Sequence, residues 1–503
     1  MKRLFSIHKN LITLLTIAVL ALTPGFAGDA YAQDRDSQMI DDADITEAIN
    51  VKLAIDERID ADNIEVSTQD YIVILEGYVA DIRSKELAVS ISQSIRGVKS
   101  VVNNIDVMAI RKADLELKRD VSEALAMDDV ADKYQIEVEA NDGVVTLNGM
   151  VESFAEKQIT ENVAKNVSGV KEINNNLQVD YDAKRADYEI RQEVERRLRN
   201  NNLIYSRLIN VRVEDNVVML NGIVGSQKHK NIAYDDAWVG GVKEIDTSGL
   251  EVRWYVYNDM VRTTRYPTMS DRETEEAIRS AMLYDPRVAS FRVDIDVEDG
   301  MATLMGRVPT MKAKRAAESD AMNTLGVWKV VNNIEVHAAT LPDDDEIEER
   351  LAMVMDRHPV VSKYDIKTTV NNHKAYLDGE VTTRYEKALA EDIATSVFGV
   401  IAVQNNIDTK SDKPILSDKE LKEQVRHQLT WDFEVDGVPI NIEANDGKVI
   451  LTGDIDSKRE YKAAIENAFQ AGALAVEAKL LLYGSNETME GTYYYKDFYN
   501  WTR

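Results

Sequence analysis

A short pattern, Leu-x-Gly-x-Val or Leu-x-Gly-x-Ile, occurs six times along the chain. Its copies are Leu75–Val79, Leu147–Val151, Leu220–Val224, Leu304–Val308, Leu377–Val381 and Leu451–Ile455. The central glycines of successive copies lie 72, 73, 84, 73 and 74 residues apart. Because self-similarity at a fixed period indicates a repeated structural unit, the sequence predicts six tandem copies of one small domain. The longest interval predicts extra chain between the third copy and the fourth.

The second copy shows what kind of element carries the pattern. The turn Asn141-Asp142-Gly143 precedes the alternating stretch Val144–Val151. Asn, Asp and Gly tolerate the positive φ angles of a tight turn, so this combination is typical of a β-hairpin. Alternation then places Val145, Leu147, Gly149 and Val151 on one face of the second strand.

The six central glycines are predicted to be structural. They fall in the middle of predicted strands, where no helix N-terminus could assist in binding an anion. A mid-strand glycine is typical of a bulge or of a close approach between backbones. We therefore expect packing positions, and not a phosphate-binding loop, at Gly77, Gly149, Gly222, Gly306, Gly379 and Gly453.

The first copy gives the order of elements. Apolar residues at helical spacing begin at Ile45 after the cap candidate Asp44, and strands are predicted over 64–68 and 71–79. A helix over 82–95 follows, then Gly97-Val98 and a closing strand that contains Asn103-Asn104. A strand–helix–strand crossover is right-handed and gives a parallel pair. The predicted fold class is α+β: six αββαβ units, each a three-stranded mixed sheet with two helices on one face.

The repeat pattern also sets the predicted domain boundaries. The repeats cover residues 42–108, 113–180, 187–252, 273–337, 343–409 and 417–482. Repeat 6 is degenerate, because Gly472-Ala473 and Ala478-Lys479 replace the Gly-Val and Asn-Asn pairs of the other copies. Residues 253–272 form an aromatic and basic junction, and residues 483–503 form an aromatic C-terminal tail. An atypical last repeat is typical of a capping unit.

The first 32 residues predict a secretory signal peptide. Basic residues precede a short apolar run, and Ala30-Tyr31-Ala32 offers the small residues that a signal peptidase requires, with cleavage near Ala32. The chain has no cysteine, which excludes disulfides and lipid attachment at a cysteine. No later run approaches the roughly 20 apolar residues of a membrane span. The prediction is a periplasmic protein with no transmembrane span in the mature chain.

Neither the charge nor the motifs indicate an enzyme. The formal net charge of −28 repels nucleic acid and, averaged over the molecule, anionic lipid headgroups. The histidines do not pair at metal-ligand spacing. Acidic turns such as 139–143 lack the distal glutamate of a calcium loop and are interpreted as hairpin turns. We expect no catalytic residues, no metal and no cofactor.

Two aromatic segments depart from the repeat pattern and are the candidate contact surfaces. Amphipathic rings beside cations suit a lipid headgroup interface or a protein hot spot, but the same rings could cover a neighbouring repeat. Both roles are open for the junction and for the tail. The candidate contact residues are Trp254, Tyr255, Tyr257, Arg262, Arg265, Tyr266, Tyr499 and Trp501.

The combination of Leu-x-Gly-x-Val, a helix, Gly-Val and a closing Asn-Asn-Ile or Asn-Asn-Leu strand resembles the BON domain, which is named for bacterial OsmY and nodulation proteins. The resemblance extends from about residue 42 to residue 482 and implies an αββαβ fold. It also implies an exported envelope protein linked to osmotic stress and outer-membrane integrity, with envelope phospholipid or periplasmic and outer-membrane proteins as partners. The alternative hypothesis is a structural or chaperone-like scaffold that binds only proteins.

Overall fold

A computed structural model describes residues 40–180, 185–254, 269–288, 293–338, 341–410, 416–432, 434–435, 440–455, 458–482 and 488–495. The chain divides into two compact units, Met1–Ile40 and Asp41–Arg503. All the helices and strands below belong to the second unit. The predicted signal peptide lies outside the described residues.

Each repeat begins with an amphipathic helix. These first helices are α1 (Asp42–Ile55), α3 (Asp114–Ala126), α5 (Asp187–Asn200), α8 (Asp271–Tyr284), α10 (Asp344–Arg357) and α12 (Asp418–Trp431). The cap of α1 is Asp41 and not Asp44, because the Asp41 carboxylate accepts the backbone N–H of Asp44 at 2.8 Å. Helix α8 begins two residues before the predicted start of repeat 4, since Ser270 and Glu273 form a capping box there.

A β-hairpin follows each first helix. Its first strands are β1 (Ile64–Gln69), β4 (Glu137–Asn141), β9 (Ile209–Glu214), β12 (Val293–Glu298), β15 (Lys367–Asn371) and β20 (Asn441–Asn445). Its second strands are β2 (Ile72–Val79), β5 (Val144–Asn148) with β6 (Met150–Val151), β10 (Val217–Val224), β13 (Met301–Val308), β16 (Lys374–Asp378) with β17 (Glu380–Val381), and β21 (Lys448–Ile455). The turns use positive φ even without glycine: Asp215 and Asn216 have φ of 53° and 65°.

A second helix and a third strand complete each repeat. The second helices are α2 (Ile82–Gln93), α4 (Phe154–Lys165), α6 (Gln227–Ala237), α9 (Met311–Met322), α11 (Arg384–Ser396) and α13 (Lys458–Gln470). The third strands are β3 (Ser100–Val107), β7 (Glu172–Asn175) with β8 (Gln178–Val179), β11 (Glu244–Val252), β14 (Lys329–Val336), β18 (Ala402–Asn405) with β19 (Asp408–Thr409), and β22 (Ala475–Leu482). Short 3-10 turns lie at η2 (Ala131–Lys133) and η3 (Ser206–Leu208).

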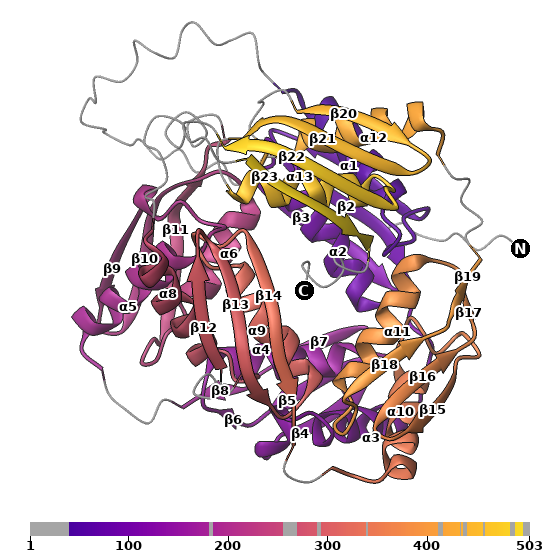
Figure 1. Cartoon of the computed structure of the whole chain (residues 1–503). Coiled ribbons are helices and arrows are strands. Elements are labelled where there is room, and N and C mark those ends of the chain that lie inside the picture. Colours follow the sequence, from indigo (N-terminus) through magenta and orange to yellow (C-terminus); the bar gives the residue numbers. More distant parts are fainter. Residues whose placement is uncertain are drawn as a thin grey trace, which may run out of the picture. The chain divides into compact units, whose positions relative to one another are not determined.

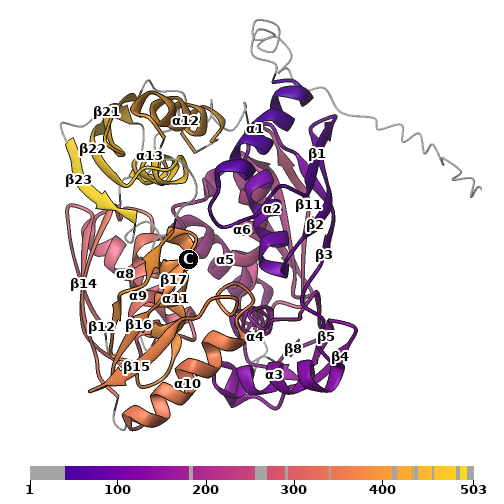
Figure 2. The same ribbon diagram turned by 90° about the vertical axis from the view of Figure 1, so that its right-hand side faces the viewer.

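The sheet of each repeat is mixed, which confirms the predicted α+β fold class. In repeat 1 the strand order is β1-β2-β3, with β1 antiparallel to β2 and β2 parallel to β3. Both helices of a repeat cover the same face of its sheet, as α8 and α9 do in repeat 4 (Figure 1) and α1 and α2 do in repeat 1 (Figure 2). This is the layer arrangement that the right-handed crossover requires.

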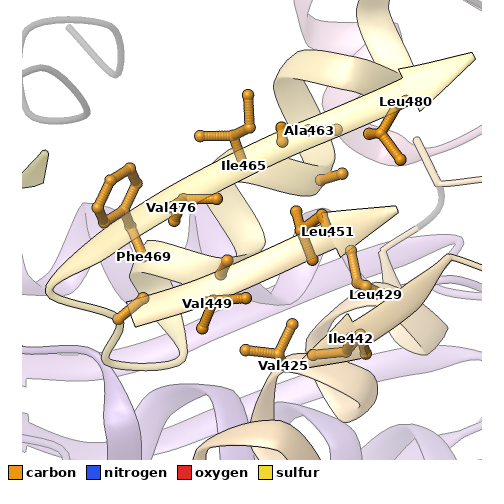
Figure 3. Close-up of a cluster of buried hydrophobic side chains, with 14 of the residues drawn as sticks. Val425, Leu429, Ile442, Val449, Leu451, Ala463, Ile465, Phe469, Val476 and Leu480 are labelled. Carbon is orange, nitrogen blue, oxygen red and sulfur yellow. The ribbon is translucent and has the colours of Figure 1, made fainter. Parts of the chain in front are cut away.

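The core of each repeat lies between its helices and its sheet. In repeat 6, Val425 of α12 and Phe469 of α13 point toward Val449, Leu451 and Val476 of the strands (Figure 3). All five side chains are almost completely buried. The alternation of the strands explains this burial, because every second residue of β21 faces the helices.

The repeated glycine lies near the end of the second strand, opposite the start of the first strand. Gly77 has φ +111°, and a Cβ atom there would lie 2.0 Å from the backbone oxygen of Asn63. A Cβ atom at Gly222 would meet the Leu208 oxygen at the same distance. At Gly149 and Gly379, with φ of 150° and 154°, the strand assignment is interrupted between β5 and β6 and between β16 and β17.

Repeat 6 carries a fourth strand that the sequence analysis did not predict. Strand β23 (Thr488–Tyr494) pairs antiparallel with β22. Met489 is completely buried in the core, and Tyr493 packs against it. Because β23 occupies the edge of the sheet beside β22, part of the predicted tail belongs to the fold of repeat 6.

Candidate functional site

Of the six candidate contact residues in the junction, only Trp254 lies within the described chain. It follows β11 and is half-buried, and the guanidinium carbon of Arg96 lies 5.7 Å from the centre of its ring. Arg96 comes from repeat 1 and also donates to the backbone oxygens of Asp432 and Val435 in repeat 6, at 3.1 and 2.8 Å. Trp254 therefore lies beside a contact between repeats. Tyr255, Tyr257, Arg262, Arg265 and Tyr266 lie outside the described residues.

The described part of the aromatic tail covers the core of repeat 6. The hydroxyl of Tyr493 lies 3.1 Å from that of Tyr461, a side chain that is 1% exposed. The ring of Tyr495 meets Phe469 edge-on, with centroids 6.3 Å apart, and Arg384 of repeat 5 lies 4.4 Å from its centre. These rings serve packing. The predicted contact residues Tyr499 and Trp501 lie outside the described residues.

Two cavities lie between repeats. The first, of about 370 Å³, is lined by residues of repeats 2, 3 and 4, among them Arg197, Asp236 and Asp320. Burial raises the pKa of Asp236 to about 6, although Arg197 and a 2.8 Å hydrogen bond from Asn201 oppose the rise. Burial also raises the pKa of Asp320 well above its usual range. Carboxyl groups in this cavity thus take up protons at mildly acidic pH.

The second cavity, of about 270 Å³, is lined by residues of repeats 2, 4 and 5. Its lining includes the cations Arg315, Arg350 and Arg357. Each of them has a carboxylate partner: Arg315 donates to Asp392 at 2.9 Å, Arg350 pairs with Glu346 at 2.5 Å, and Arg357 pairs with Glu123. These three cations are therefore paired with carboxylates where the repeats meet.

A buried charged cluster joins repeats 3 and 6. His229 is 1% exposed, and its Nε2 lies 2.5 Å from a guanidinium nitrogen of Arg459. Arginine can only donate, so Nε2 accepts and the imidazole is neutral. Burial, together with Arg459, lowers the pKa of His229 well below its usual range. Glu434 completes the cluster and lies 3.1 Å from Arg459. Burial alone would raise the pKa of Glu434, but the positive charge of Arg459 outweighs it and lowers this pKa to about 2.

The sequence analysis missed two residues that link the elements of several repeats. An Asp at the start of the first helix accepts the backbone N–H groups of the hairpin turn, as Asp42 does from Asp70 and Tyr71 at 2.8 and 2.9 Å. The first Asn of the Asn-Asn pair links the third strand to the second helix: Asn405 donates to the Lys387 oxygen at 2.8 Å. Their recurrence at a fixed distance from the repeated glycine is the signal that could have identified them.

A metal site and a membrane span would each require a recognisable arrangement of the described residues. No group of three or more His, Cys, Asp or Glu side chains among them is placed to hold a metal ion. Within the same ranges, no helix is both long and apolar enough to cross a membrane. The polar chemistry of this part of the chain is concentrated where repeats meet.

Comparison with solved structures gives weak similarities only. The C-terminal domain of CdsD, the structural protein of the type III secretion system of Chlamydia trachomatis, is 15% identical and covers 45% of this chain and 100% of its own, with a TM-score of 0.13. A second CdsD structure is 11% identical, covers 44% of this chain and 99% of its own, and has a TM-score of 0.12. Scores this low carry no argument about function.

Comparison with protein sequences is more informative. Osmotically-inducible protein Y of Escherichia coli (strain K12) is 29% identical over 191 residues, which cover 34% of this chain and 95% of that protein. The BON domain model matches six times, at residues 41–109, 113–181, 186–253, 270–338, 343–411 and 417–479. These matches cover well over half of the chain and agree with the six αββαβ units of the structure. The chain therefore belongs to the BON domain family, as a protein with six tandem repeats.

Proposed function

We propose that this protein is a non-enzymatic component of the periplasm that maintains the cell envelope under osmotic stress by binding phospholipid or a membrane-associated protein. The observation that carries the proposal is the run of six BON domains, together with a relative named as osmotically inducible. The non-enzymatic part rests on the sequence, in which neither the motifs nor the spacing of the histidines indicates a catalytic or metal site.

The junction is the surface that we propose for this contact. Residues 253–272 combine aromatic rings with Arg262 and Arg265 in an otherwise acidic chain. Such a segment suits a membrane interface, because the rings tolerate the headgroup region while the cations attract phosphate. The repeats share one fold, so they do not by themselves explain binding at one place along the chain.

The alternative is a scaffold that binds only proteins. It is favoured by the net charge of −28, which opposes approach to an anionic lipid surface at low ionic strength. Under this alternative the junction rings form a protein hot spot. The two functions differ in what they predict for protein-free vesicles.

Cosedimentation with vesicles at low salt tests the proposal. The full mature chain is mixed with vesicles of phosphatidylethanolamine and phosphatidylglycerol, and separately with vesicles of phosphatidylcholine. Lipid binding predicts sedimentation with at least one of them, and a loss of binding when Trp254, Tyr257 and Tyr266 are replaced by serine. Tyr188→Ser is the control, because Tyr188 is an exposed ring on α5 that lies outside the junction in the sequence. Absence of binding to both vesicles would favour the scaffold.

A further inference from the structure

The same backbone hydrogen bond joins repeats in three pairs. In each case the donor is the backbone N–H of the residue just before the Gly-Val pair. The acceptor is the backbone oxygen of the last residue of another repeat's first helix. The three bonds are Arg96 to Trp431 at 3.1 Å, Ser168 to Arg357 at 2.8 Å and Leu325 to Asn200 at 2.8 Å. They pair repeat 1 with 6, repeat 2 with 5, and repeat 4 with 3. Each pair therefore links the first half of the chain (repeats 1–3) to the second half (repeats 4–6).

Side chains near the ends of the first helices strengthen these pairs. Arg357 of α10 forms an ion pair with Glu123 of α3. In the pair of repeats 3 and 4, the guanidinium of Arg197 lies 4.9 Å from the centre of the Tyr284 ring. Isolated β-bridges add to two of the pairs, between Ile95 and Asp432 and between Asn201 and Thr324. The first-helix end is thus a repeated pairing surface.

Within the first half, the second helices contact one another in a closed cycle. The residue nine positions after the repeated glycine contacts the C-terminal part of the next second helix. These contacts are Glu86 with Lys165 at 2.5 Å, Gln158 with Asp235 at 3.2 Å and Asn231 with Gln93 at 3.0 Å. They run from repeat 1 to 2, from 2 to 3 and from 3 back to 1.

The second half forms a comparable cycle in the same direction, but its middle contact differs: it comes from Arg384, five positions after the repeated glycine, and ends on the loop after α13. Its contacts are Arg315 with Asp392 at 2.9 Å, Arg384 with the Ala473 oxygen at 3.0 Å and Lys462 with Asn323 at 3.2 Å. They run from repeat 4 to 5, from 5 to 6 and from 6 back to 4. A head-to-tail contact that closes after three units leaves no open end. The second helices therefore link the three repeats within each half. The ends of the first helices link the two halves, and second helices add to this contact, as Arg459 of α13 does with His229 of α6.

Both halves supply both sides of the pairing bond. In the first half, repeats 1 and 2 carry donors and repeat 3 carries an acceptor. In the second half, repeat 4 carries a donor and repeats 5 and 6 carry acceptors. A surface that carries both partners of its own contact is self-complementary. We propose that each three-repeat half is a closed unit whose pairing surface takes another three-repeat half of this chain as its partner, so that two copies can exchange halves. This proposal is independent of lipid binding.

The test uses the full chain with a specific protease site inserted within residues 255–268. After cleavage, native mass spectrometry should show the two halves as one non-covalent complex. Glu123→Arg and Arg357→Glu copies are then cleaved, mixed and brought to equilibrium. Exchange of halves restores opposite charges at this contact in both new complexes. Mixed-copy complexes should therefore outnumber the original complexes by roughly fivefold, where random exchange gives equal numbers, as a surface ion pair worth about 1 kcal/mol implies.

The matched control mixes unaltered copies with Arg212→Glu copies. Arg212 pairs with Glu214 on the same strand, at 3.1 Å, so this mixture should exchange to its statistical share. The proposal is overturned if the cleaved halves separate or lose their circular dichroism. It is equally overturned if the Glu123→Arg and Arg357→Glu halves remain with their original partners at equilibrium.

Discussion

At the scale of single residues, the repeated glycine shows how a short pattern determines a fold. At Gly77, Gly149, Gly222 and Gly379 a Cβ atom would lie 2.0–2.9 Å from a backbone oxygen just before the first strand, and φ is positive. Both conditions disfavour any residue with a side chain, which explains why the pattern carries glycine at this point of the hairpin. The aspartate that binds the hairpin turn and the asparagine that binds the second helix then hold the other elements around that hairpin.

Gly77→Ala should lower the free energy of unfolding of repeat 1 by more than the cost of placing alanine at a positive φ. The new Cβ would lie 2.0 Å from the Asn63 oxygen, so the strands must separate, and we expect a cost of about 2–4 kcal/mol in the free energy of unfolding. Gly472→Ala is the matched control. Its φ of +105° is similar, but the nearest atom is 3.7 Å away, so about 1 kcal/mol is expected. Equal losses in denaturant titrations would contradict the close-contact explanation.

Asp236→Asn should change the pH dependence of stability. The pKa of Asp236, raised to about 6 by burial, lies above its value in the unfolded chain. The folded state therefore binds the extra proton between about pH 4 and 6, and stability falls as pH rises through 6. Asn keeps the acceptor for Asn201 without the charge. We expect a gain on the order of 1–2 kcal/mol at pH 8 and almost none at pH 4.

Thermal unfolding at both pH values measures this effect. Asp294→Asn, a change at an exposed position on β12, is the control and should leave the difference between pH 4 and pH 8 unaltered. An Asp236→Asn variant with the full pH dependence of the unaltered chain would show that another group, such as Asp320, is responsible.

At the scale of elements, the Asn-Asn pair has two different roles. Asn405 points inward: it donates to the Lys387 oxygen of α11 at 2.8 Å, and its own oxygen accepts the backbone N–H of Ile407 at 3.2 Å. Asn406 points outward and donates to Asp378 on the neighbouring strand at 3.1 Å. The first residue links the third strand to the second helix, and the second only makes an exposed hydrogen bond between two strands.

Asn405→Ala should therefore cost more than Asn406→Ala. The first change removes the hydrogen bonds that the Asn405 side chain makes to the Lys387 oxygen and to the backbone N–H of Ile407, which we expect to cost about 1–3 kcal/mol. The second acts on an exposed pair and should stay within about 0.5 kcal/mol. Hydrogen exchange in β18 and α11 would locate the loss in the first variant. Similar effects of both changes would contradict the separate roles.

The order of elements could be predicted from the sequence because each is marked by a local pattern. Alternation marks the hairpin, helical spacing marks α1, and the glycine of Gly97-Val98 marks the turn into β3. Strand β23 was missed because its alternation, with Met489 and Tyr493 facing the core, occurs in one repeat only. The contacts between repeats could not be predicted, because residues such as Gln158 and Asp235 have the composition of a solvated helix face. Their pairing depends on a three-dimensional arrangement that no local pattern reports.

At the scale of the whole molecule, the contacts between repeats bury charges that an isolated repeat would leave in water. Removing one partner of a buried, hydrogen-bonded charge is costly, because the other partner stays desolvated. The cluster of His229, Arg459 and Glu434 is of this kind and joins α6 of repeat 3 to α13 of repeat 6. Its geometry requires a neutral imidazole, and this requirement makes the contact sensitive to pH.

Acidification from pH 7 to pH 5.5 should loosen the contact between repeats 3 and 6. The pKa of His229 is lowered in the folded chain by burial and by Arg459, so the unfolded or opened state binds a proton that the folded state excludes. Stability from this group is complete above about pH 6.5 and falls below it, by up to about 1.4 kcal/mol per pH unit. The opening of α6 and α13, measured as the hydrogen-exchange rate relative to the intrinsic rate at each pH, should therefore increase at pH 5.5. His229→Gln keeps an acceptor for Arg459 without a titrating group and should remove this increase, while His337→Gln, at an exposed site, should leave it unchanged. An increase that survives His229→Gln would assign the acid response to other groups at the repeat contacts.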